Sequence, residues 1–363
     1  MTRSKKKQKN RGNKNAADAI VPDSPPSKQE NLDILVDEAE AAIDSFNYDT
    51  AEAKLKEYLN HNPNNTKALE MLASVYIEES DWMQAENLLK RCIDLSPEIG
   101  HSKYFSLAQF NEGEESLRFY QKGIQVIEKE IGNWENIIPA KDEDERKRLI
   151  RSLSDAYCSI SEIYMTDCCD SENAEGNCFS AIEAAISSDP SNTDAYQSLA
   201  NFHLVKGQTK EAKEATEKSL SFWLPLHEAL RDGELDETAS KDLENVLPSY
   251  DSRIQTSKLL IELEMLDEAT NILDGLYEED DEVVEVLYLL GWTNYNQGDD
   301  YKLNAHYYLK KAKEMGVKTG LAEVECMSHI DELLEELQAS HPLDADDTEE
   351  MEDLEWDIES DSE

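Results

Sequence analysis

The stretch Tyr48–Pro63, YDTAEAKLKEYLNHNP, is followed 34 residues later by Trp82–Pro97, WMQAENLLKRCIDLSP, which has the same apolar pattern. In this register Ala51 matches Ala85, and both stretches end in proline. A small side chain lets two helices approach closely, and proline cannot continue a helix. The repeated stretch therefore predicts a chain built from helical hairpins of about 34 residues each.

A second small residue lies twelve positions before the first, at Ala39 and again at Ala73. Two small residues, a proline and a period of 34 residues together indicate the tetratricopeptide repeat. An ordinary amphipathic bundle would show apolar periodicity but not these three residue types in register. The same pair recurs at later positions: Ala200 with Ala212, Ser257 with Ala269, and Gly291 with Ala312. We expect an all-α, right-handed superhelical solenoid of seven hairpins over residues 31–340.

Several segments depart from the regular period. The segment Tyr104–Ile127 predicts a third hairpin with a short first helix, and Glu128–Arg151 is expected to lengthen the first helix of the fourth. Leu224–Ser249 predicts an extra helix between the fifth and sixth hairpins. Gly320–Ser340 has the leucine spacing of a terminal helix that covers the apolar face of the last repeat.

The 363 residues carry a formal net charge of −45, which is unevenly distributed. Residues 1–14 contain seven Lys or Arg and no acid, whereas residues 344–363 contain twelve acids and no base. We expect disordered tails over residues 1–30 and 341–363, because such segments cannot bury enough apolar surface to fold. The acidic body repels phosphates and anionic lipids, so basic proteins are the expected partners rather than nucleic acid or membranes.

Both tails suggest functions that have simpler alternatives. The basic tail resembles a nuclear import signal, although it could equally be a solubilising tail. The acidic tail holds Leu354 and Trp356 among its carboxylates, which favours contact with a basic partner over a role in solubility alone.

No pattern in the sequence indicates catalysis, a cofactor or a metal. Gly-rich phosphate loops and the common hydrolase motifs are missing from the sequence. Apolar runs are too short for a membrane helix, and the first residues do not resemble a secretory signal. The six cysteines are too few for a disulfide framework, so we expect a reducing compartment, with Cys168, Cys169 and Cys178 as buried structural thiols.

In a tetratricopeptide array the first helix of each hairpin faces the concave side, so the groove residues can be assigned from the register. Eleven acids occupy such positions against two bases, Lys67 and Lys258. The predicted acidic residues are Asp33, Glu40, Asp44, Glu70, Glu78, Asp155, Glu162, Asp194, Asp251, Glu262 and Glu285. Four aromatic residues join them: Phe105, Tyr288, Trp292 and Tyr295.

This predicted groove suits an extended basic segment, because carboxylates pair with arginine and aromatic rings stack on its guanidinium. The alternative for the acids is that they only keep the surface soluble. The alternative for Trp292 is a place in the core, since it follows the packing residue Gly291.

The register, the two tails and the segment Leu107–Ile124, LAQFNEGEESLRFYQKGI, together resemble the family of assembly chaperones of eukaryotic large-subunit ribosomal protein four. This resemblance spans residues 31–340 and both tails. It implies a monomeric chaperone, shuttling between cytoplasm and nucleus, that shields an extended loop of its basic client, with an import receptor as a possible further partner.

Two other classes stay open at this point. A heat-shock co-chaperone would need a cationic clamp for a C-terminal carboxylate, but Val36, Glu40 and Met71 occupy such positions. A scaffold subunit of a nuclear multiprotein complex would be distinguished by its constant presence in a stable assembly.

Overall fold

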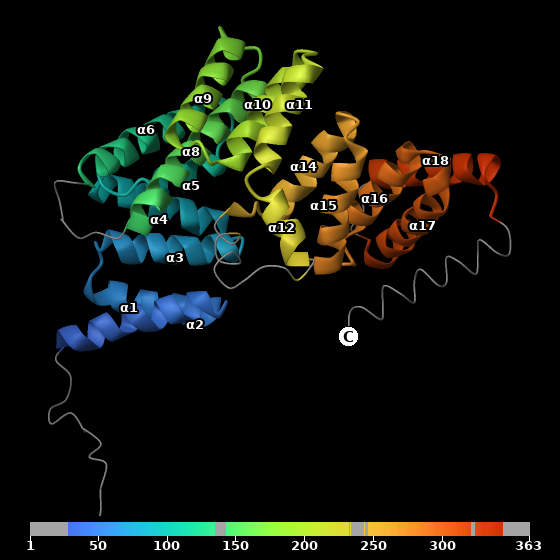
Figure 1. Cartoon of the computed structure of the whole chain (residues 1–363). Helices are drawn as coiled ribbons and strands as arrows, with labels where there is room; N and C mark the ends of the chain where they lie inside the picture. The colour runs from blue at the N-terminus through green and yellow to red at the C-terminus, as the bar shows by residue number, and fades with distance from the viewer. Residues whose placement is uncertain are drawn as a thin grey trace, which may run out of the picture. The chain divides into compact units, whose positions relative to one another are not determined.

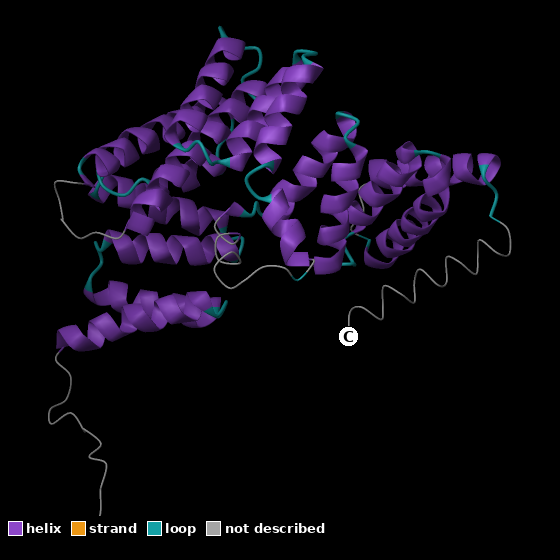
Figure 2. Cartoon of the chain, viewed as in Figure 1, coloured by secondary structure: helices purple, strands orange, loops and turns teal. Residues whose placement is uncertain are grey.

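The structure, a computed structural model of the whole chain, describes residues 28–134, 143–231, 246–320 and 324–343, together with Gly233 and Leu243. Within these residues it contains sixteen α-helices, one short 3-10 helix and no strand (Figures 1 and 2). The predicted all-α fold is therefore confirmed for the described part of the chain.

Consecutive helices pack as seven antiparallel pairs, the number that the repeat register predicts (Figure 1). The pairs are α1 (Lys28–Asp44) with α2 (Tyr48–His61), α3 (Thr66–Glu78) with α4 (Trp82–Leu95), α5 (Ser102–Gln109) with α6 (Gly113–Gly132), α8 (Glu143–Met165) with α9 (Ala174–Ser188), α10 (Thr193–Val205) with α11 (Thr209–Leu220), α14 (Tyr250–Glu262) with α15 (Leu266–Glu279), and α16 (Val284–Gln297) with α17 (Lys302–Thr319).

Three further elements complete the described chain. Helix α12 (Leu224–Arg231) follows the fifth pair, and the 3-10 helix η1 (Asp299–Tyr301) joins α16 to α17. Helix α18 (Val324–Ser340) packs mainly on α17 and also touches α16. The extra helix and the terminal helix were both predicted from the sequence.

The chain divides into two compact units, residues 1–97 and residues 98–363. The first unit contains the two most regular repeats. Its small residues Ala39, Ala51, Ala73 and Ala85 have no exposed surface, as the packing of paired helices requires. The steric role that the sequence assigned to these alanines is therefore confirmed.

The second unit contains the other five hairpins and a large apolar core. Its small residues Ala200, Ala212, Ala269 and Ala312 are also completely buried. A Cβ atom added at Gly291 would lie 2.5 Å from Cγ of Leu309 on α17, so α16 and α17 are in direct contact at this glycine. Larger residues at these positions would force the paired helices apart.

Four hairpin turns share one backbone conformation. Phe46, Ser80, Gly207 and Glu264, each between the two helices of its pair, have positive φ angles of 56° to 69°. This left-handed conformation costs about 1 kcal/mol for residues that have a Cβ atom. It reverses the chain within three residues and so allows the tight antiparallel packing of each pair.

The helix boundaries correct two expectations. Helix α1 begins at Lys28, so the predicted basic tail is shorter than 30 residues. The segment predicted to lengthen only the fourth hairpin instead extends α6 to Gly132 and also begins α8 at Glu143. Both helices gain stability by lengthening, because each added turn satisfies further backbone hydrogen bonds. Residues 1–27 and 344–363, which include most of both predicted tails, lie outside the described residues.

All six cysteines are free thiols. Cys168 and Cys178 are buried as predicted, whereas Cys169, the neighbour of Cys168 in the turn between α8 and α9, is exposed, which corrects the prediction for that thiol. None of the described helices is both long and apolar enough to cross a membrane.

Candidate functional site

The predicted acids lie on the first helices of the pairs, as the register requires. They are on α1, α3, α8, α10, α14 and α16, and none of their side chains is buried. They are therefore accessible to a partner, but they do not form one cluster, and the two units are considered separately.

In the second unit, three of the predicted acids meet in one hollow of about 420 Å³. Asp155 and Glu162 come from α8, Asp194 comes from α10, and Ser252 and Gln255 come from α14. All the residues lining this α8–α14 hollow belong to first helices. At this hollow the first helices therefore form an accessible surface.

The electrostatics of the α8–α14 hollow centre on Asp155. Asn192 donates a hydrogen bond from Nδ2 to Oδ1 of Asp155 at 2.8 Å. Although Asp155 as a residue is exposed, the surrounding protein desolvates its carboxyl group, and this raises the pKa of Asp155 to about 6. The negative charges of Asp194 and Asp189 act in the same direction, whereas the hydrogen bond from Asn192 and the positive charge of Arg151 oppose them. A cation entering the hollow would relieve this repulsion.

The rest of the hollow is lined by neutral hydrogen-bonding groups and one thiol. Ser252 donates from Oγ to Oδ1 of Asp194 at 2.7 Å, which fixes that carboxylate in place. Burial raises the pKa of the Cys158 thiol, so it stays neutral. The hydroxyl and carboxamide side chains that line the hollow are Ser159, Gln197, Ser198, Asn201, Ser252 and Gln255. Carboxamides can both donate to and accept from the backbone of an extended peptide.

The sequence prediction missed these neutral groups, although the spacing contained a signal. Ser159 and Ser198 follow Asp155 and Asp194 by four residues, which places each serine on the same helix face as its acid. A search for polar residues one turn after each groove acid would have found them.

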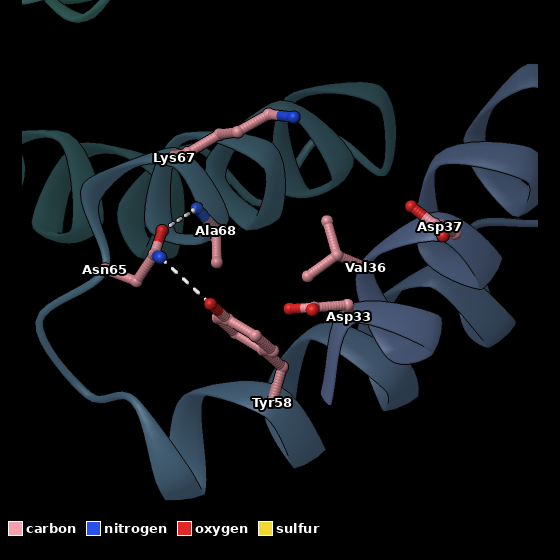
Figure 3. Close-up of a pocket in the computed structure, with 7 residues that line it drawn as sticks. All are labelled: Asp33, Val36, Asp37, Tyr58, Asn65, Lys67 and Ala68. Atoms are coloured by element: carbon pink, nitrogen blue, oxygen red, sulfur yellow. Dashed lines mark hydrogen bonds between the residues drawn. The ribbon is translucent and has the colours of Figure 1, made fainter. Parts of the chain in front are cut away.

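In the first unit, Asp33 lines a small pocket between α1, α2 and α3 (Figure 3). Asn65 accepts a hydrogen bond from the backbone of Ala68 at 3.0 Å and donates to the hydroxyl of Tyr58 at 2.9 Å. Figure 3 shows the carboxyl group of Asp33 directed toward Tyr58, while the ammonium group of Lys67 points away from the pocket. The pocket between α1, α2 and α3 is consequently lined by an acidic group and an aromatic ring.

A second pocket of the first unit, here called the turn pocket, lies beside the α1–α2 turn. It has a volume of about 420 Å³ and brings together the predicted acids Asp44 and Glu78. Its other lining residues are Ile43, Phe46, Tyr48, Ser74 and Val75.

Both bases at predicted groove positions are paired with predicted acids. Lys67 lies 2.6 Å from Glu40, and Lys258 lies 2.5 Å from Glu285. These exposed ion pairs contribute little to stability, but they neutralise part of the acidic surface. Of the other predicted acids, Glu70 is half-buried on α3, and Asp251 and Glu262 are exposed on α14 outside the hollow.

The aromatic residues of α16 contact α18. The Tyr288 hydroxyl is 2.7 Å from Nδ1 of His329, and the Trp292 ring lies edge-on to the same imidazole at a centroid distance of 5.7 Å. Tyr295 donates from its hydroxyl to Glu336 at 2.7 Å. All three aromatic side chains also pack on the core of the second unit. In this arrangement their rings are held by the terminal helix, away from the α8–α14 hollow.

Phe105 is also a packing residue in this structure. Its ring lies 5.8 Å from the Tyr120 ring and 5.4 Å from the His101 ring. It is half-buried against the core formed by α6 and α8. The short helix α5 is thereby fixed to α6, where Gly123 leaves room for the ring.

The described residues offer no cluster of three or more His, Cys, Asp or Glu side chains able to hold a metal ion. What the hollow offers is fixed negative charge, hydroxyls and carboxamides. Such groups bind a cationic peptide without covalent chemistry.

Comparison with known proteins gives a consistent picture. The tetratricopeptide repeat family matches residues 42–106. The chain is 32% identical over 309 residues to the "Probable assembly chaperone of rpl4" of Schizosaccharomyces pombe, covering 80% of this chain and 85% of that protein. It is 25% identical to the protein of the same description from Emericella nidulans, covering 67% of this chain and 58% of that protein.

A solved structure of the "Assembly Chaperone of RpL4 (Acl4)" aligns with a TM-score of 0.63 and 26% identity, covering 74% of this chain and 97% of the solved chain. The tetratricopeptide fold predicted from the 34-residue period is thus confirmed. Helical register, sequence identity and three-dimensional similarity agree over most of the chain: it belongs to the family of assembly chaperones of ribosomal protein L4.

Proposed function

We propose that this chain is a dedicated chaperone that binds large-subunit ribosomal protein four through an extended basic segment. The observation that carries the proposal is the α8–α14 hollow, where Asp155, Glu162 and Asp194 meet among hydroxyl and carboxamide groups. The client is inferred from the names of the relatives, which are assembly chaperones of rpl4. The net charge of −45 explains why a basic client would be attracted to this chain.

The physical task of such a chaperone is to replace RNA until assembly. A segment rich in Arg and Lys attracts any available polyanion before it reaches its ribosomal site. Carboxylates of the hollow would pair with these side chains, while carboxamides such as Gln197 and Gln255 hydrogen-bond the extended backbone. The client is thereby kept unfolded locally but shielded from wrong partners.

Charge reversal tests the proposal. The variant with Asp155→Lys and Asp194→Lys should lose capture of co-expressed protein four, and the client should then precipitate. A matched control is Glu211→Lys with Glu217→Lys, which changes the same charge on exposed positions of α11, outside the hollow. Equal capture by both variants, with unchanged helicity, would remove the hollow as the binding site.

The proposal includes transport as a monomer between cytoplasm and nucleus, with the client held until assembly. Residues 1–14, with their seven bases, would be read by an import receptor. Deletion of these residues should slow nuclear entry of the chaperone alone and of its complex with protein four, as followed by live imaging. Unchanged entry in both cases would mean that the client supplies the import signal.

We also propose that the chain acts by binding and not by catalysis. Stoichiometric protection of the client, with one chaperone required for each client kept in solution, would support this. Protection by substoichiometric amounts would contradict it. A scaffold role predicts instead that the native chain always sediments in a large assembly.

A further inference from the structure

The turn pocket of the first unit combines two carboxylates with two aromatic rings. Asp44 ends α1 and Glu78 ends α3, so the two acids lie at the same end of neighbouring first helices. Phe46 and Tyr48 lie on the turn and at the start of α2, with ring centroids 6.4 Å apart and an interplanar angle of 86°. The pocket therefore presents negative charge and π surface together.

The carboxylates of this pocket lack basic partners in the described chain. Among the ion pairs of the described residues, none includes Asp44 or Glu78, although Glu40 on α1 pairs with Lys67 on α3. Within the described residues, the hydrogen bond that Glu78 accepts is a long one, 3.5 Å, from the Tyr48 hydroxyl. Two uncompensated carboxylates at one pocket favour a cationic ligand.

The Phe46 side chain is not used for folding. It is 79% exposed, although its backbone adopts the left-handed conformation that disfavours a side chain. The three turns with the same conformation carry Ser80, Gly207 and Glu264 instead, so the turn itself does not need an aromatic residue. An exposed ring beside two carboxylates is the arrangement that stacks on a guanidinium.

We propose that the turn pocket binds an arginine side chain of the basic client. The guanidinium would stack on Phe46 or Tyr48 while its N–H groups donate to Asp44 and Glu78. Lysine would gain less, because its ammonium group is compact, more strongly hydrated, and unable to bind a carboxylate in a planar two-point contact. The inference rests on the proposed function and deepens it. The proposed function requires only that acidic side chains bind a basic client, and the turn pocket adds a preference for arginine over lysine.

The test compares two synthetic peptides from the extended basic segment of protein four, one native and one with every Arg replaced by Lys. Their dissociation constants for the full-length chain are measured by fluorescence anisotropy at about 0.15 M salt. We expect wild type to prefer the arginine peptide about two- to fivefold, which corresponds to the ~0.5–1 kcal/mol of an exposed cation–π contact. In Phe46→Leu and in Glu78→Gln the preference should fall to about one, with the lysine peptide nearly unaffected.

Glu264→Gln is the matched control, because its backbone conformation is the same as that of Phe46 and it lies outside the turn pocket. It should keep the preference. Circular dichroism checks that each variant is folded. We expect Phe46→Leu to fold normally, because the Phe46 side chain is exposed.

A preference for arginine that survives both pocket variants would overturn the inference, as would equal losses for the two peptides. If removal of residues 1–14 tightens arginine-peptide binding in wild type but not in Phe46→Leu, the chain's own basic tail competes with the client for the turn pocket, which supports the inference. Failure of the proposed function looks different, since neither peptide would then bind wild type, or reversal of Asp155 and Asp194 would leave both affinities unchanged.

Discussion

The α8–α14 hollow and the aromatic face of α16 come from the same kind of repeat position, yet the structure treats them differently. In the hollow, Asp155 and Asp194 stay accessible, and their helices are followed by further first helices that leave a gap. On α16, Tyr288 and Trp292 are stacked on each other at 6.0 Å and contact His329 of α18. In the described part of the chain, α18 is the helix that follows α17, and it contacts the aromatic face of α16.

The difference teaches that repeat position alone does not define a binding surface. A residue at a groove position binds a partner only if no other element of the chain packs on it. Apolar rings at the end of an array are costly to leave in water, so a terminal helix covers them. Carboxylates in the middle of an array are better left hydrated, which keeps them available.

The largest effect is expected from Trp292→Ala. Loss of the ring that stacks on Tyr288 and contacts His329 should lower the free energy of unfolding by ~2–3 kcal/mol, less than for a fully buried tryptophan. Urea denaturation measures this effect. Client affinity of the folded protein should change less than about twofold, because the ring lies outside the hollow. Wild-type stability combined with lost client binding would show that the ring contacts the client after all; Tyr301→Ala, an exposed position on η1, is the control.

Next in size is the effect of charge reversal in the hollow. Asp155→Lys with Asp194→Lys should weaken binding of protein four at least ~10-fold at low salt, because two attractive contacts become repulsive. Circular dichroism checks that the variant stays folded, because Asp155 loses its hydrogen bond from Asn192 and Asp194 loses its hydrogen bond from Ser252. Isothermal titration calorimetry gives the affinity. If the α11 control variant loses as much affinity as the hollow variant, the effect comes from the overall charge of the protein and not from the hollow.

A smaller effect should appear in the pH dependence of binding. With a pKa of about 6, the Asp155 carboxyl group is roughly one tenth ionised at pH 5 and roughly nine tenths ionised at pH 7. Client affinity should therefore rise severalfold from pH 5 to pH 7, and client binding in this range should release protons from Asp155. Asp155→Asn should reduce this dependence of affinity on pH. An identical profile for the variant would exclude Asp155 from cation binding.

The same group has an opposite effect on stability. The folded-state pKa of Asp155 lies above its ordinary value of 3.8, so its contribution to stability is complete below pH 3.8 and is lost as the pH rises through 6. Asp155→Asn should thus raise the thermal midpoint at pH 7 by a few degrees at most, because water still reaches this partly desolvated carboxyl group and screens its charge. It should give no gain near pH 4.

The smallest effects are expected from substitutions at the hairpin turns. These substitutions leave both the α8–α14 hollow and the aromatic face of α16 intact, so they separate stability from client binding. Ser80→Gly and Glu264→Gly should each raise the free energy of unfolding by ~0.5–1 kcal/mol, because glycine adopts the left-handed conformation without strain. Client affinity should be unchanged. A loss of stability in either variant would mean that the side chain has a packing role that outweighs the relief of strain.

The regular repeats were the part of the fold that could be predicted best. Ala39, Ala51, Ala73 and Ala85 are buried because helix contact leaves no room for a larger side chain, and this requirement is visible as a period in the sequence. The boundary between α6 and α8 was harder to predict from the sequence. Glu128–Arg151 has a helical pattern throughout, and this local pattern does not indicate which neighbouring helix the segment extends.

The sequence by itself determined the class of fold, the seven hairpins, the terminal helix and the acidity of the first helices. Each of these depends on local spacing and charge, which are properties of the chain before it folds. Only the tertiary structure decided which groove residues stay open: Asp155, Glu162 and Asp194 share a hollow, whereas Tyr288, Trp292 and Phe105 are packed against other helices. That choice depends on contacts between residues far apart in sequence, and a periodic pattern contains no information about the distance between them.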